Sequence, residues 1–277
     1  MFRCSLRGSA LRRGPGGIAM LRCTCCRAMC CGTGGIALFS GEPLRSRRPL
    51  LCSPSTHCCT MRRRSALRGG RSVGGPVMEA MRRAAQEAVF CETILAKSGD
   101  NVLLKTLRGA TPVTWEHYPP GDVFDRDSGA QWYYHCHNAG PEAVEHGHFH
   151  CFIRPQGKDG PIHHLVAVGV DAYGKAIRLF TVNQWVVDDV WADADTTIAL
   201  LDAFDVQMAR PSYLVNRWLT AIIGLYHNEI AALITQRDAV LATHVPPHGT
   251  ETRQDRALEV VSQCSIELQA RAAELGI

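Results

Sequence analysis

Apolar side chains recur at helical spacing in several segments of the chain. They repeat every three or four residues over residues 78–97, which predicts an amphipathic helix over this segment. The same period returns in three later segments separated by prolines, at residues 195–208, 214–245 and 252–275. We expect the last two segments to form an antiparallel helical hairpin that covers one face of a sheet.

Between these helical segments, the pattern is that of strands. Residues 131–137 and 146–154 alternate between polar and apolar side chains, and residues 164–170 are apolar at nearly every position. After a turn, residues 175–187 return as the other arm of a hairpin. The pattern predicts an α+β fold: a central antiparallel sheet of about four strands, flanked by an N-terminal helix and a C-terminal helical hairpin.

Composition divides the chain near Gly75. Residues 1–75 contain 14 arginines, one acidic residue and nine of the 13 cysteines, with little hydrophobic periodicity. Residues 76–277 contain 16 basic and 25 acidic side chains, a net charge of −9. We expect residues 76–277 to be a single α+β domain. Residues 1–75 are either a Cys/Arg-rich disordered tail or a stretch upstream of the true start, with translation beginning at Met78 or Met81.

Two further interpretations of residues 1–75 remain open. Several closely spaced cysteines could supply thiolates to zinc, although they do not repeat a Cys-x-x-Cys pair across a loop: Cys23, Cys25, Cys26, Cys30 and Cys31. An Arg-rich, acid-poor beginning is also typical of an organelle transit peptide. We favour a start at Met78 or Met81.

The acidic composition of residues 76–277 excludes several classes of partner. Nucleic-acid binding needs clustered positive charge, which an acidic domain does not offer. No apolar run approaches the roughly 18 residues that a membrane span requires. Only four cysteines lie in this part, which suits a reducing compartment. We therefore expect a cytoplasmic protein that acts on a small molecule and binds neither nucleic acid nor membrane.

Histidine is concentrated in one stretch of the chain, since seven of the 12 histidines lie between His135 and His164. Because side chains on a strand alternate between faces, His146, His148 and His150 share one face. His135 and His137 share a face of the preceding strand in the same way. If the two strands are antiparallel neighbours, five imidazoles stand together on one face of the sheet.

This arrangement predicts a metal site with ligands from two strands. Residues two apart on a strand are about 6.5 Å apart and residues four apart about 13 Å, so three histidines of one strand cannot comfortably bind one ion. Our preferred ligands are His148 and His150 with His137, while His135 and His146 are substitutes or supporting groups. Three protein ligands with an open position are typical of catalytic zinc or, with a carboxylate, of iron(II).

Glu145 is the carboxylate nearest to these histidines in the sequence. It can act as a metal ligand or as the general base for a metal-bound water, with His148 at the reacting centre. We therefore predict a site for zinc, iron or manganese that serves hydrolysis or oxidation of a small molecule. Two alternatives are a non-catalytic metal-binding or interaction domain and a sheet face whose histidines are merely solvated.

One short motif resembles the histidine triad superfamily. It is HGHFHCFIRP at residues 146–155, preceded by NAGPE at residues 138–142. The resemblance implies a metal-independent nucleotide phosphoramidate hydrolase or transferase. In that case His148 attacks the α-phosphate, while His146 and His150 orient and donate protons around it.

A longer set of motifs is similar to an uncharacterised bacterial family known as a domain of unknown function. The motifs are HYPPGDV, EHGHFHCFIRP, HLVAVGVDAYGKAIRLFT and NQWV, which begin at residues 117, 145, 164 and 183. This resemblance implies that residues 1–75 lie outside the domain, and it implies no activity.

Overall fold

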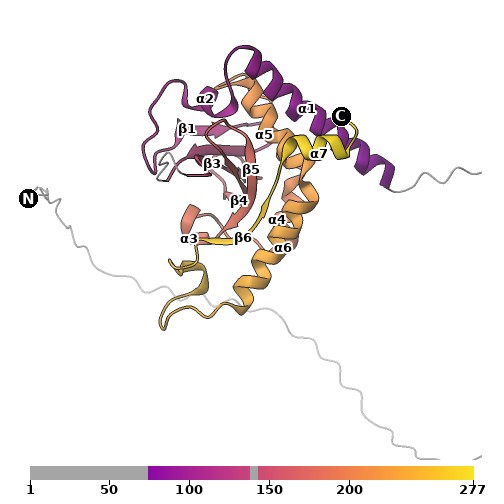
Figure 1. Cartoon of the computed structure of the whole chain (residues 1–277). Helices are drawn as coiled ribbons and strands as arrows, with labels where there is room; N and C mark the ends of the chain where they lie inside the picture. Colours follow the sequence, from indigo (N-terminus) through magenta and orange to yellow (C-terminus); the bar gives the residue numbers. More distant parts are fainter. Residues whose placement is uncertain (1–73, 138–142) are drawn as a thin grey trace, which may run out of the picture. The chain divides into compact units, whose positions relative to one another are not determined.

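The computed structural model describes residues 74–137 and 143–277, so the expectations for the Cys/Arg-rich beginning of the chain lie outside the described residues. The described residues belong to one compact unit of the chain, Ala66–Ile277. In this unit, a central sheet has long helices along one side (Figure 1).

Six strands form the sheet, and they lie side by side in the order in which they occur in the chain. All neighbours are antiparallel. The strands are β1 (Tyr118–Phe124), β2 (Ala130–His135), β3 (Gly147–Ile153), β4 (His163–Val170), β5 (Ala176–Val182) and β6 (Val260–Ser265). The strand β6 returns from the helical region to pair with β5, so β1 and β6 are the two edges of the sheet.

The helices precede the sheet and fill the segment between β5 and the C-terminus. They are α1 (Gly74–Lys97), α2 (Val102–Leu107), α3 (Gln184–Val187), α4 (Ala194–Leu201), α5 (Tyr213–Leu225), α6 (His227–Thr243), the short 3-10 helix η1 (Thr252–Gln254) and α7 (Leu268–Glu274). Side-chain oxygens of Asn101, Asp193 and Ser212 accept backbone N–H groups at the starts of α2, α4 and α5.

The main core lies between the sheet and the helices. Trp132 of β2 and Phe149 of β3 are fully buried, and the Phe149 ring lies 5.9 Å from the ring of Trp218 on α5. The indole N–H of Trp132 donates to the side-chain oxygen of Asn216 at 3.0 Å. Because β2 and β3 present these aromatic residues to the helices, their alternate residues face the opposite side of the sheet.

That opposite side has a smaller apolar cluster of its own. Ala167, Phe180 and Val182 are buried there, and Val186 of α3 and Val260 of β6 pack against them. The histidine-bearing positions of β2 and β3 lie on this side. They are therefore enclosed without being part of the helix-covered core.

The predicted α+β class with an antiparallel sheet is confirmed, and α1 includes the predicted helix over residues 78–97. The prediction of about four strands was two short. The additional strand β1 contains Pro119 and Pro120, which read as a loop in the sequence. Proline is tolerated there because an edge strand has backbone groups that no neighbour pairs with.

The predicted C-terminal helical hairpin is wrong. Residues 252–275 contain η1, the strand β6 and the short helix α7 instead of one helix. Pairing along β5 satisfies the backbone of residues 260–265, and this tertiary contact overrides the apparent helical period. The segment predicted as one helix over residues 214–245 is divided into α5 and α6 at Tyr226.

Among the described residues, no helix is long and apolar enough to cross a membrane.

Candidate metal centre

The pairing of β2 with β3 brings two histidines face to face. His135 lies directly opposite His148 in the antiparallel register, and their ring centroids are 4.5 Å apart. His150 follows two residues later on the same face of β3, with its ring 4.8 Å from that of His148 and 5.0 Å from that of His135. The three imidazoles therefore form a contiguous buried group.

His137 joins this group from the segment just after β2. Its ring lies 5.0 Å from that of His135 and 5.1 Å from that of His148. One nitrogen from each of His135, His137 and His148 lies within 4.8 Å of the others. These three histidines could hold a metal ion, and we call them the three-histidine group.

The closest contact in the three-histidine group joins two ring nitrogens. The Nε2 atoms of His135 and His148 are 2.7 Å apart, which is the distance of a shared hydrogen bond. Two nitrogens that bind one tetrahedral zinc ion at about 2.05 Å are about 3.3 Å apart. An ion bound by both nitrogens would therefore require them to lie farther apart than they do here.

Glu145 and Arg178 hold the ring of His148 from the other side. The Nδ1 atom of His148 is 2.9 Å from Oε1 of Glu145. The guanidinium of Arg178 donates to both oxygens of the same carboxylate, from Nε to Oε2 and from Nη2 to Oε1. Because an ionised carboxylate only accepts, His148 donates from Nδ1 and keeps the lone pair of Nε2 for His135 or for a metal.

Two glycines make room for this arrangement. A Cβ atom on Gly147 would lie 2.2 Å from the Tyr134 hydroxyl and 2.5 Å from the backbone oxygen of His135. A Cβ atom on Gly169 would lie 2.3 Å from Oε2 of Glu145. Both contacts are shorter than packed atoms allow, so these positions need glycine for close approach.

The Nδ1 atoms of His146 and His150 contact residues outside the three-histidine group. The Nδ1 atom of His146 is 2.6 Å from the Tyr134 hydroxyl, which places this ring outside the three-histidine group. The Nδ1 atom of His150 is 3.0 Å from Nε2 of His164 on β4. The other nitrogen of His150, Nε2, is buried and has no hydrogen-bond partner among the described residues. The structure thus places His135, rather than His150, with His137 and His148.

Burial keeps His135, His148 and His150 neutral. It lowers the pKa of His135 to about 3, and the neighbouring His148 and His137 act in the same direction. Burial also lowers the pKa of His148, although Glu145 partly opposes this shift, and lowers the pKa of His150 well below its usual value. Neutral imidazoles offer lone pairs at neutral pH, as metal ligands must.

The carboxyl group of Glu145 is ionised in this environment. Burial raises the pKa of Glu145, but the hydrogen bonds from His148 and Arg178 outweigh it, so the pKa lies below its ordinary value. Both of its oxygens are engaged, and its imidazole partner is Nδ1 of His148 rather than the Nε2 atom that faces His135.

A hollow of about 200 Å³ opens beside His137 and His148. Glu145, Arg178, Phe180 and Glu259 are among the residues that line it. The side chain of Glu259 forms no hydrogen bond or ion pair with the described residues, and nothing in the sequence pattern singled it out. It comes from the segment just before β6, a strand that the sequence analysis did not predict.

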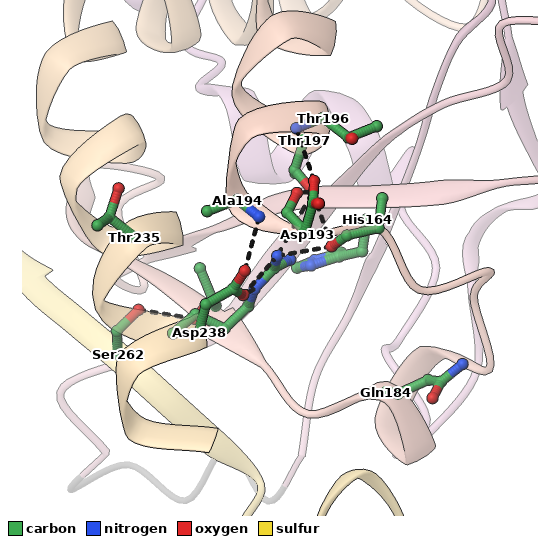
Figure 2. Close-up of polar contacts among 12 residues, drawn as sticks. His164, Gln184, Asp193, Ala194, Thr196, Thr197, Thr235, Asp238 and Ser262 are labelled. Atoms are coloured by element: carbon green, nitrogen blue, oxygen red, sulfur yellow. Dashed lines mark hydrogen bonds and ion pairs between the residues drawn. The ribbon is translucent and has the colours of Figure 1, made fainter. Parts of the chain in front are cut away.

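Polar contacts fix the beginning of β4, where His164 lies beside His150. The backbone N–H of His164 donates to the Asp189 carboxylate at 2.9 Å, and burial, reinforced by Arg237, lowers the pKa of the His164 ring to about 3. Nearby, the Asp238 carboxylate accepts the N–H of Ala194 at 2.6 Å (Figure 2). The first contact joins the beginning of β4 to the segment after α3, and the second joins α4 to α6.

Comparison with known protein families identifies the family of this chain. The model of the family described as domain of unknown function DUF6969 matches residues 82–266, and the chain belongs to this family. No curated protein and no solved structure matches the chain. The match covers most of α1 and all six strands, and therefore the whole three-histidine group.

Proposed function

We propose that the protein binds a divalent metal ion through His135, His137 and His148 and uses it to hydrolyse or oxidise a small molecule. The observation that carries the proposal is the convergence of three imidazoles. Two of them, His135 and His148, are buried with lowered pKa values, and His148 is oriented by a carboxylate. Imidazole nitrogens suit zinc and iron(II), whereas manganese(II) prefers oxygen ligands, so zinc or iron is favoured.

Glu145 serves this site by orienting His148. A carboxylate that accepts the second N–H of a ligating histidine fixes the ring and raises the basicity of its ligand nitrogen. Arg178 in turn fixes the carboxylate, since it donates to both oxygens. This role accounts for the contacts of Glu145 better than direct ligation or general-base catalysis, because its oxygens are already engaged.

His150 provides a fourth nitrogen next to the three-histidine group. Its ring is fully buried, and its free Nε2 atom is an unsatisfied polar atom in the interior. The ligand set His137, His148 and His150 therefore remains an alternative to the set with His135. Separate His135→Ala and His150→Ala variants decide between the two sets, because only the removal of a true ligand abolishes metal binding.

The hollow beside His137 and His148 gives a substrate access to the open coordination position. A bound zinc or iron ion supplies Lewis acidity there, which polarises a water molecule or a substrate oxygen. Phe180 offers an apolar wall, while Glu259 offers an unpaired carboxylate. A volume of about 200 Å³ suits a small polar molecule rather than a polymer.

Metal content tests this function first. The full chain is purified without chelator and analysed by mass spectrometry beside a His135→Ala, His148→Ala double variant. Near-stoichiometric zinc or iron in the parent and its loss in the variant support the proposal, and the loaded protein is then screened against hydrolase and oxidase substrates. An equal metal content in both proteins would mean that other groups, such as the N-terminal cysteines, bind the metal, and this result would contradict the proposal.

A parent protein that stays free of metal after reconstitution also contradicts the proposal. Hydrolysis of nucleoside phosphoramidates by that protein, abolished by His148→Ala, would instead favour the histidine-triad alternative. Absence of both metal and turnover would favour a non-catalytic interaction domain.

A further inference from the structure

A groove on the β1 edge of the sheet gathers positive charge on a domain that is otherwise acidic. Arg108, Arg126, Lys158 and Arg210 line this groove, and all four side chains are exposed. They come from four separate segments, namely the end of α2, the turn after β1, the loop after β3 and the segment before α5. We call this feature the basic groove.

None of these four cations is neutralised by the described part of the chain. Their side chains form no ion pair and no hydrogen bond with the described residues, whereas other arginines of the domain, such as Arg178 and Arg217, are paired with carboxylates. Because residues 76–277 carry a net charge of −9, four unpaired cations in one groove are a marked local excess of positive charge.

The acidic residue of the basic groove does not offset this charge fully. Asp122 has both carboxylate oxygens engaged, one with Nδ1 of His117 and one with the Gln131 amide, each at 3.0 Å. Arg108 occupies a left-handed backbone position, with φ of 52°, at the end of α2. Glycine or asparagine is favoured there, so the chain places arginine at this point against the backbone preference.

The shape and lining of the basic groove indicate the ligand. Its volume is about 400 Å³, the size of a small-molecule site. Phe124 and Met208 add apolar surface to its lining. Guanidinium groups present paired N–H donors that match phosphate oxygens. We propose that the basic groove binds a small organic phosphate, with the phosphate held by the arginines and an apolar body lying against Phe124 and Met208.

This site is separate from the three-histidine group and does not depend on bound metal. It lies at the β1 edge, whereas the hollow next to the three-histidine group is lined by residues of β3, β5 and β6. Failure of the metal proposal therefore leaves this proposal intact, and the reverse also holds.

Phenyl phosphate is a suitable probe because it combines a dianion with an apolar ring. The isotope-labelled full chain is titrated and followed by nuclear magnetic resonance, which separates binding in the groove from binding to the Arg-rich residues 1–73. We expect saturable shifts of the Arg108, Gly121, Arg126 and Arg210 signals with one dissociation constant. Inorganic phosphate binds more weakly, because it lacks the apolar ring, and phenol does not bind.

Paired charge variants provide the control. Arg126→Ala with Arg210→Ala weakens phenyl phosphate binding by roughly tenfold or more. Arg82→Ala with Lys97→Ala removes the same charge from exposed positions of α1 and leaves binding unchanged. Equal weakening in both double variants, or shifts confined to residues 1–73, would overturn the proposal.

Discussion

The Nδ1 atom of His148 lies 2.9 Å from Oε1 of Glu145, and this contact determines which nitrogen of the imidazole faces His135. Since Glu145 is held ionised by Arg178, His148 donates from Nδ1 and presents the lone pair of Nε2 to the centre of the three-histidine group. Without a metal, that lone pair accepts the N–H of His135. A metal ion held by His135 and His148 would take the place of this hydrogen bond.

Glu145→Gln should weaken metal binding without unfolding the protein. The amide can still accept from Nδ1, but it loses the charge that orients and polarises His148. Loss of such a supporting carboxylate lowers metal affinity by roughly 10- to 100-fold. Competition with a chromophoric zinc chelator measures the change. Glu259→Gln is the matched control, because Glu259 lines the same hollow but forms no hydrogen bond with His148 among the described residues. The metal affinity of this variant should equal that of the parent protein.

Gly169→Ala should disturb the same contact through the neighbouring strand. The added methyl group would lie 2.3 Å from Oε2 of Glu145 and 2.9 Å from Cγ of Arg178, so the carboxylate must move away from His148. We expect metal affinity to fall by about tenfold, as for other losses of supporting groups. Gly224→Ala places its methyl group 3.7 Å from Ala84 and should leave affinity unchanged. Equal affinity in both variants would contradict the orienting role of Glu145.

The buried histidines predict that the metal-free protein loses stability in mild acid. Their pKa values are lowered in the folded state, to about 3 for His135 and His164, while the unfolded chain titrates near 6.5. Below pH 6.5 only the unfolded state takes up these protons, so the free energy of unfolding falls as the pH drops towards 3. Each such group contributes a slope of about 1.4 kcal/mol per pH unit.

Urea unfolding between pH 7.5 and about 4.5, in the presence of chelator, measures this slope. His164→Gln should reduce it, because one buried titrating group is removed. His248→Gln should not, because His248 is exposed. A free energy of unfolding that stays constant from pH 6.5 to 4.5 would contradict the burial of neutral histidines.

Trp115 should report metal binding by fluorescence. Its side chain is 61% exposed, and its ring lies 4.3 Å from the ring of His137. Paramagnetic cobalt(II) bound at the three-histidine group should therefore quench the emission of an exposed tryptophan. Trp132 and Trp218 lie in the helix-covered core and should be affected less. The quenching should disappear in Trp115→Phe and also in His137→Ala, and its persistence in His137→Ala would place the metal elsewhere.

The sequence was sufficient to predict a cluster of histidines but not to predict which of their rings converge. Alternation along the strands correctly groups His148 with His150, and pairing of adjacent strands brings in His135. The contacts that engage the Nδ1 atoms of His146 and His150 involve Tyr134 and His164. Those contacts depend on side-chain orientation and on strand register, which the spacing of histidines in one chain does not determine.

The fold could be predicted where the contacts are local and not where they are distant in sequence. The strands β2 to β5 follow from periodicity and turns, because each pairs with a neighbour along the chain. The helix α1 follows from its own helical period, although it packs against the distant helix α5. The strand β6 reaches β5 only after 77 intervening residues, from 183 to 259, and its apolar residues fit a helical period equally well. Pairing with β5 decides its structure, and with it the placement of Glu259 at the hollow.

A cobalt(II) titration of the chelator-treated full chain tests the central claim most directly. The account predicts one cobalt ion bound by nitrogen ligands, with visible absorption bands. It predicts no near-ultraviolet thiolate-to-cobalt band, because such a band would indicate binding by the N-terminal cysteines. His135→Ala, His137→Ala and His148→Ala should each abolish these bands, while His146→Ala should retain them, because His146 is bound to Tyr134. Unchanged bands in the first three variants, or absorption from thiolate ligands alone, would contradict a metal centre at the three-histidine group.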